Sequence, residues 1–155
     1  MVDADGSVQF VDLIGLLLSV ATNAWLLFVA TPRIGRTRTI CWAIVAISGA
    51  FLVPMVVIFG MGGIGFRPPT WFDDRLFQLV FTFVTLALLS LMNALFGAMV
   101  EALTRFHERH NAANAHRFPL RFVIANRALL EIGFTCLWWS GSVLMFYGIW
   151  SDLHI

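Results

Sequence analysis

Four long apolar runs constrain the fold of this chain more than any other feature of its sequence. They extend over residues 8–30, 40–60, 76–103 and 122–150. Each is long enough for the roughly 20 residues that an α-helix needs to cross a hydrocarbon core of about 30 Å. Because lipid offers the backbone no hydrogen-bond partners, a spanning segment must satisfy its own, and these runs predict four transmembrane helices.

The composition agrees with this prediction. Of the 155 residues, 59% are hydrophobic and 12% are charged, and the mean hydropathy is +0.84. Soluble domains are typically about 45–50% apolar and about 25% charged. We therefore expect an integral membrane protein, an all-α four-helix bundle that forms a single transmembrane domain over residues 1–155.

Arginines mark one side of this predicted bundle. The segments after the first and third runs hold Arg33, Arg36, Arg38, Arg105, Arg109, Arg117 and Arg121. The opposite side holds only Arg67 and Arg75. Since short cytoplasmic loops are rich in basic residues, we expect a multi-pass protein of the cell membrane with both basic loops in the cytoplasm and both termini outside. The seven arginines should contact anionic lipid headgroups, which makes the bilayer itself an expected partner.

Small and polar residues recur along one side of the first and third runs. They are Asp12, Ser19 and Asn23 in the first run, and Ser90, Asn93 and Gly97 in the third. Residues at spacings of three or four share a helix face, and small residues let helices approach closely in lipid. These faces should pack inside the bundle, with Asn23 and Asn93 as a candidate hydrogen-bonded pair. The natural layout pairs the first run with the second and the third with the fourth.

Three charged residues interrupt the third and fourth runs. Arg127 and Glu131 lie one helical turn apart, and Glu101 lies near the end of the third run. A charge at the bilayer centre costs at least about 2.5–3.5 kcal/mol, so placement of all three at the cytoplasmic boundary is favoured. The sequence indicates an ion-pair cluster with Arg127 between the two carboxylates. Such a cluster would either clamp the two helices together or relay protons or ions.

The segment between the third and fourth runs carries His107, His110 and His116, with Glu101 and Glu108 nearby. Imidazole and carboxylate groups together bind zinc, iron or copper. The stretch HERH lacks the spacing of the H-E-x-x-H zinc motif, and H-x-x-H alone does not define a metal site. A solvated basic loop at an anionic leaflet is the favoured interpretation. Metal binding and pH sensing by histidine remain alternatives, and no cofactor can be assigned.

The sequence contains no complete catalytic constellation. Cys41 and Cys136 lie in separate apolar runs without a C-x-x-C pair, which argues against a thiol-disulfide oxidoreductase. The glycine-rich stretch GMGGIG is not followed by lysine, so it does not form a phosphate-binding loop. No nucleic-acid partner is expected.

The leading hypothesis is a non-catalytic multi-pass protein that acts through helix packing, either as a homo-oligomer or as an accessory subunit of a membrane complex. One alternative is a proton-linked small transporter or channel that uses Glu101, Arg127 and Glu131. Another is a membrane-embedded enzyme with a histidine and glutamate site in segment 104–121. Size selects none of these, because a fold of this kind supports several functions.

Overall fold

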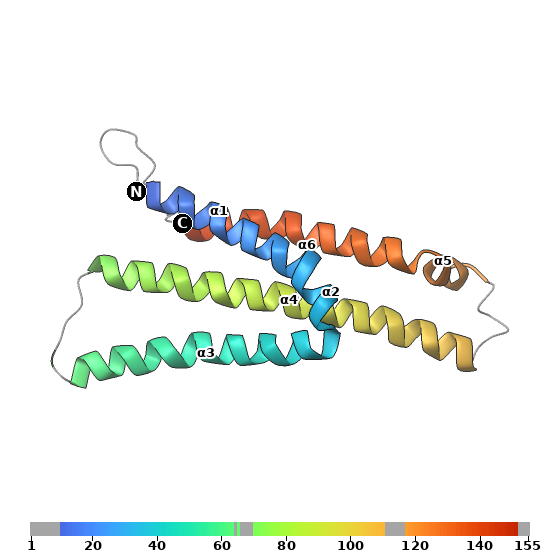
Figure 1. Cartoon of the computed structure of the whole chain (residues 1–155), viewed down its shortest axis with the longest axis horizontal. Helices are drawn as coiled ribbons and strands as arrows, with labels where there is room; N and C mark the ends of the chain where they lie inside the picture. Colours follow the sequence, from blue (N-terminus) through green and yellow to red (C-terminus); the bar gives the residue numbers. More distant parts are fainter. Residues whose placement is uncertain (1–9, 64, 66–69, 111–116, 152–155) are drawn as a thin grey trace.

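The computed structural model describes residues 10–63, 65, 70–110 and 117–151 of the chain. These residues are almost entirely helical, and no strand occurs among them. Figure 1 shows long helices lying roughly side by side, with α1 beginning near the point where α6 ends. The elements are α1 (Phe10–Trp25), a π-helical turn η1 (Leu26–Ala30), α2 (Thr31–Ile34), α3 (Arg36–Gly63), α4 (Thr70–His110), α5 (Leu120–Ala125) and α6 (Arg127–Trp150).

Within the described part of the chain, four helical stretches are long and apolar enough to cross a membrane. They are Phe10–Ile34, which joins α1, η1 and α2, then α3, Arg75–His110 of α4, and α6. The predicted all-α class and its four long apolar helices are confirmed. The fourth run differs in detail, because a break at Asn126 divides it into the short α5 and the long α6.

The first two long helices are separated by a single residue, Gly35. The sequence predicted a basic loop between residues 30 and 40, but α2 continues to Ile34 and α3 begins at Arg36. Gly35 has a φ of 88°, a left-handed conformation that glycine adopts without a steric penalty. The chain therefore turns within one residue, and Arg36 stands at the start of a long helix.

The helix pairing agrees with the expected layout only in part, because the third and fourth runs pack together as α4 and α6 but the first and second runs do not form a pair. The main contacts of α1 are with α6, and those of α3 are with α4, while α4 also contacts α6. Figure 1 shows α4 between α3 on one side and the α1 and α6 pair on the other. A buried hydrogen bond joins α1 to α6, because Asn23 Nδ2 of α1 donates to Ser142 Oγ of α6 over 2.6 Å. Both side chains are fully buried, so each needs a polar partner inside the bundle.

The indole of Trp150 joins three helices at the end of the bundle where α1 begins. Its Nε1 lies 3.1 Å from Ser19 Oγ of α1 and 3.1 Å from Thr82 Oγ1 of α4. The ring covers Gly15, where an added Cβ would overlap the indole carbons, so only glycine fits there. Trp150 belongs to the buried core together with Leu86, Leu89 and Phe146.

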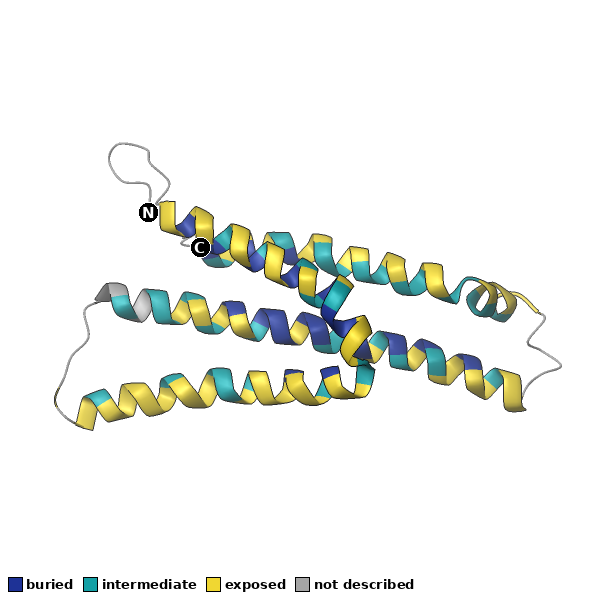
Figure 2. Ribbon diagram, viewed as in Figure 1, coloured by how far each residue is buried: buried dark blue, intermediate teal, exposed yellow. Residues whose placement is uncertain are grey.

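The outer helix α3 contributes little to this core. Its buried residues are Thr39 and Ala43, both near its beginning. Figure 2 shows α3 exposed along most of its length, whereas the middle of α4 is largely buried. The far half of α3 therefore presents apolar side chains such as Val53, Val56 and Phe59 outward.

Candidate functional site

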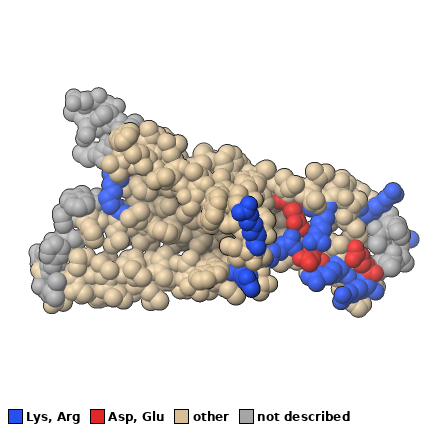
Figure 3. All heavy atoms as spheres, in the orientation of Figure 1, with Lys and Arg blue, Asp and Glu red and all other residues tan. Residues whose placement is uncertain are grey.

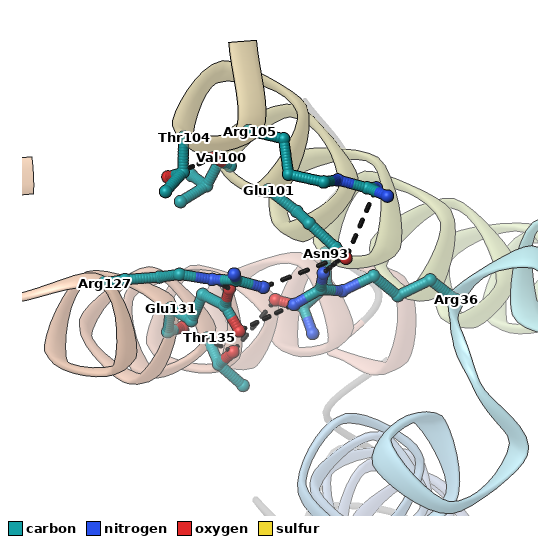
Figure 4. Close-up of polar contacts among 9 residues, drawn as sticks. All are labelled: Arg36, Asn93, Val100, Glu101, Thr104, Arg105, Arg127, Glu131 and Thr135. Carbon is teal, nitrogen blue, oxygen red and sulfur yellow. Dashed lines mark hydrogen bonds and ion pairs between the residues drawn. The ribbon is translucent and has the colours of Figure 1, made fainter. Parts of the chain in front are cut away.

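A network of five charged side chains joins α3, α4 and α6 at one end of the bundle. Arg36 stands at its centre, because its guanidinium donates from Nη1 to Glu101 Oε2 and from Nη2 to Glu131 Oε2, the latter over 2.7 Å. Figure 4 shows Arg36 reaching from the start of α3 into the space between α4 and α6. One arginine thus bridges the acids of two helices.

Two further arginines complete this charged network. Arg127 Nε lies 3.1 Å from Glu131 Oε1, and Arg127 Nη2 lies 3.7 Å from Glu101 Oε2. Arg105 Nη2 lies 3.3 Å from Glu101 Oε1, one helical turn along α4. The network therefore holds three guanidinium groups and two carboxylates, which leaves a formal charge of +1.

Gly97 makes room for the central arginine. It lies one turn before Glu101 on α4, and a Cβ added there would stand 2.7 Å from Arg36 Nε and 3.0 Å from Arg36 Cζ. These separations are well below ordinary van der Waals contact. The absence of a side chain at Gly97 lets Arg36 lie against the α4 backbone with its charge directed at Glu101 and Glu131.

A cavity of about 770 Å³ opens beside the charged network. It is lined by the charged residues Arg36, Glu101, Arg105 and Glu131 and also by Phe28 and other apolar residues. Figure 3 shows acidic and basic side chains gathered at the end of the molecule where α4 ends, with uncharged surface over most of the rest of this face. The cavity thus lies where charged and apolar surfaces meet.

Polar side chains continue from the charged network toward the middle of the bundle. Thr135 Oγ1 of α6 lies 2.9 Å from Asn93 Oδ1 of α4 and 2.9 Å from the carbonyl oxygen of Glu131. The expected pairing of Asn23 with Asn93 is wrong, because Asn23 bonds to Ser142. The amides of Asn23 and Asn93 both bond to hydroxyl groups of α6, a helix that was not predicted to supply their partners.

A second charged contact lies at the opposite end of the bundle. Arg75 Nη1 of α4 donates to Asp12 Oδ1 of α1 and lies 2.7 Å from Gln78 Oε1. Asp12 is 7% exposed, so its carboxylate is buried against this arginine. The sequence analysis assigned Asp12 to a packing face and gave it no cation. Its partner was missed because Arg75 is distant in sequence and was counted only for orientation.

The other predicted packing residues lie inside the bundle. Ser19, Asn23 and Ser90 are buried, Gly97 is buried against Arg36, and Asn93 is half-buried. Ser90 Oγ has no hydrogen-bond partner in the described part of the chain. The small and polar face of α4 is therefore used for contacts within one chain.

The predicted headgroup arginines fall into two groups. Arg36 and Arg105 pair with the glutamates, as described above. The remaining five are exposed, namely Arg33, Arg38, Arg109, Arg117 and Arg121. The role of Arg36 was missed because it was read as part of a loop. The signal that could have identified it is Gly97, the single glycine of α4, which lies one turn before Glu101.

The histidines do not form a described metal centre. His107 and His110 lie in the last turn of α4, beside Phe106, whose ring centroid is 5.4 Å from that of His107 and 5.3 Å from that of His110. His116 lies outside the described residues. Among the described residues, no three histidine, cysteine or acidic side chains are grouped closely enough to hold a metal ion.

Comparisons with models of protein families, with curated proteins and with solved structures gave no match.

Proposed function

We propose that this chain is a multi-pass membrane protein that acts through helix packing and forms a homo-oligomer through the outward face of α6. The main support for a homo-oligomer is a strip of small residues on α6 that packs against nothing else in the described chain. The proposal keeps the basic end of the bundle in the cytoplasm, because arginine is concentrated there.

Membrane insertion is supported by the distance between the two charged levels. The stretches 13–32, 39–63, 76–100 and 132–150 carry no charged residue. At 1.5 Å per helical residue they measure about 28–38 Å, which matches a hydrocarbon core of about 30 Å. Asp12 and Arg75, which pair with each other, precede 13–32 and 76–100. Glu101 and Glu131 of the Arg36 network follow 76–100 and precede 132–150. Both charged groups are thus suited to the boundary regions, where the cost of a charge is small.

The outward face of α6 supports close association with another helix. Its small residues are Gly133, Ser140, Gly141 and Gly148, all exposed. A Cβ added at any of the three glycines would have none of the described residues within 4 Å. Small residues at helix spacing mark contacts in lipid, because backbones can then approach closely and gain van der Waals contact.

The same face carries large side chains between the small ones. Leu137 is 66% exposed and Leu144 is 75% exposed. A helix that presents both leucine knobs and glycine gaps on one face is complementary to a second copy of itself. A two-fold axis between copies would let the leucines of each chain enter the glycine gaps of its neighbour, as an isologous contact requires. For this reason we favour a homo-oligomer over an accessory subunit of a larger complex.

The native cysteines provide a direct test. Cys136 is exposed on α6 and lies between Gly133 and Ser140, whereas Cys41 is exposed on α3. In native membranes, a Cys41→Ala variant should form a cross-linked dimer through Cys136 with a short bis-maleimide. A Cys136→Ala variant, which retains only Cys41, should give far less dimer.

Bulky substitutions provide the matched comparison. Gly141→Leu should abolish the Cys136 cross-link by filling the gap, while Gly49→Leu on α3, where an added Cβ also meets no described residue within 4 Å, should leave it unchanged. Equal cross-linking through Cys41 and Cys136, or an undiminished Cys136 cross-link in Gly141→Leu, would count against the α6 contact.

Proton-linked transport is a second candidate function, favoured by one observation. Glu101 and Glu131 both line the cavity, and Arg36 bridges them as a counter-charge that could change partners. Purified protein in liposomes should then support a proton flux that a Glu101→Gln, Glu131→Gln double variant loses. Identical flux from the two proteins would exclude this candidate and leave the charged network with a structural role.

A further inference from the structure

We infer that the cavity beside the charged network binds the phosphate group of an anionic amphiphile, with its apolar part along Phe28 and Ile132. The inference rests on the proposed membrane insertion, but it does not depend on the oligomer. The supporting observation is that one cavity is lined both by guanidinium N–H donors that have few acceptors and by exposed apolar side chains.

The charge of the network favours an anion. Three arginines face two glutamates, so one positive charge is not matched within the network. Arg36 is committed to both acids and is 28% exposed at its side chain. Arg105 makes one contact of 3.3 Å with Glu101, and its side chain is 58% exposed. A guanidinium has five N–H donors, so Arg105 retains most of them for an acceptor in the cavity.

Arg127 does not line the cavity, but it adds positive charge next to Glu101 and Glu131, which do. Its side chain is 36% exposed, and its Nη2 is 3.7 Å from Glu101, a separation longer than a hydrogen bond. A phosphate oxygen in the cavity could therefore accept from Arg105 without displacing Arg36, while Arg127 offsets the charge of the two glutamates. Planar guanidinium forks suit phosphate oxygens in particular, because two parallel N–H bonds match their geometry.

Apolar side chains also line the cavity, and some of them are exposed. Phe28 of η1 and Ile132 of α6 both line the cavity, and they are 44% and 58% exposed. Phe96 also lines it, with its ring stacked on Phe134 at a centroid distance of 3.5 Å. Ile132 follows Glu131 directly, so apolar surface begins immediately beside the charged network. This arrangement suits a ligand with a charged head and an apolar tail better than a small soluble anion.

The depth of the cavity agrees with such a ligand. In the proposed orientation it lies at the basic end of the bundle, at the level of the headgroups. Basic pockets between transmembrane helices at this level are suited to anionic lipid headgroups. A soluble phosphate would share the same guanidinium donors, so the experiment must separate the two sources.

Calorimetric titration of delipidated protein in a neutral detergent would test the inference. The probes are short-chain phosphatidylglycerol, diacylglycerol with the same chains but no phosphate, and inorganic phosphate. We expect phosphatidylglycerol to saturate at one molecule per chain, diacylglycerol to bind at least about tenfold more weakly because it loses the charge-assisted hydrogen bonds of the phosphate, and inorganic phosphate to give no saturable signal.

Matched arginine variants assign the binding to the cavity. Arg105→Gln should weaken phosphatidylglycerol binding by about tenfold or more. Arg109 is also exposed and lies one turn further along α4, but it does not line the cavity, so Arg109→Gln should leave the affinity unchanged. Ile132→Ser should reduce the gain in affinity that longer acyl chains provide.

Three outcomes would overturn the inference. Equal affinity for phosphatidylglycerol and for diacylglycerol would show that the arginines do not bind the phosphate group. Equal loss in Arg105→Gln and Arg109→Gln would place binding outside the cavity. If inorganic phosphate binds saturably and as tightly as phosphatidylglycerol, the ligand of the cavity is a small anion and not an amphiphile. Cross-linking through Cys136 should be measured on the same preparations, so that lipid binding and the proposed oligomer are tested separately. If the protein still cross-links but does not bind the lipid, the inference about the cavity fails and the proposed oligomer stands.

Discussion

Replacement of Gly97 by alanine sets two opposing effects against each other. The first is stabilising, because alanine is favoured over glycine in a helix interior by about 0.8–1 kcal/mol. The second is destabilising, because the new Cβ would stand 2.7 Å from Arg36 Nε and displace the guanidinium that bridges Glu101 and Glu131.

The magnitudes favour destabilisation. Contacts between carbon atoms prefer about 3.5–4.0 Å, so Arg36 must move by about 1 Å, enough to weaken both of its hydrogen bonds. A hydrogen bond to a charged group contributes about 1.5–3 kcal/mol. The three side chains are 28–33% exposed, and solvent screening reduces the combined loss to about 2 kcal/mol. The gain in helix propensity offsets about 1 kcal/mol of this loss. The Gly97→Ala protein should therefore be less stable than the wild type by about 1 kcal/mol.

A double-mutant cycle tests this reasoning in a measurement of the free energy of unfolding in mixed micelles. In an Arg36→Ala background the clash is gone, so Gly97→Ala should stabilise the protein by up to about 1 kcal/mol. Gly49→Ala on α3 is the control, because an added Cβ there meets none of the described residues within 4 Å. It should have the same small effect in both backgrounds.

The sign change of the Gly97 effect is the decisive result. If Gly97→Ala stabilises the wild type and the Arg36→Ala protein equally, Arg36 does not lie against Gly97 and the bridging geometry is refuted. If Gly49→Ala also changes sign, the effect arises from α3 as a whole and not from the close approach at Gly97.

Two further substitutions probe the opposite end of the bundle. Gly15→Ala should cost about 1–3 kcal/mol and lower the thermal midpoint, because the new Cβ overlaps the buried Trp150 ring; an unchanged midpoint would contradict this packing. Arg75→Gln should cost about 2 kcal/mol, because it leaves the buried Asp12 carboxylate without its cation. An Asp12→Asn, Arg75→Gln double variant should recover much of that loss, and strictly additive losses would argue against the ion pair.

The fold class could be predicted because lipid leaves the backbone few solutions. Long apolar runs predict helices whatever their exact sequence. Helix pairing could not be predicted in the same way, because a buried amide such as Asn23 accepts many partners. Asn93 and Ser142 were both chemically suitable, and only the three-dimensional packing selects Ser142.

The charged network was partly predictable. Glu101, Arg127 and Glu131 were expected at one depth from the positions of their helices, and ion pairs join them in the structure. Arg36 was not predicted at their centre, because a proline and several arginines resemble a loop in sequence. A single left-handed residue, Gly35, turns the chain instead and directs Arg36 inward.

The outward face of α6 was also missed. The small residues of the third run, around Ser90 and Gly97, were predicted to mark helix contacts, and in the structure they make contacts within the chain. Sequence spacing identifies a small face but does not say which helix covers it. On α6 the corresponding glycines, Gly133, Gly141 and Gly148, have no described residue against them.

Native mass spectrometry of the protein released from its own membrane would show whether copies of this chain associate with one another. We expect a mass that is a multiple of the 17.4 kDa chain, without a second polypeptide, and dissociation of this complex by Gly141→Leu. A single 17.4 kDa chain, or a stoichiometric complex with a different polypeptide, would contradict it.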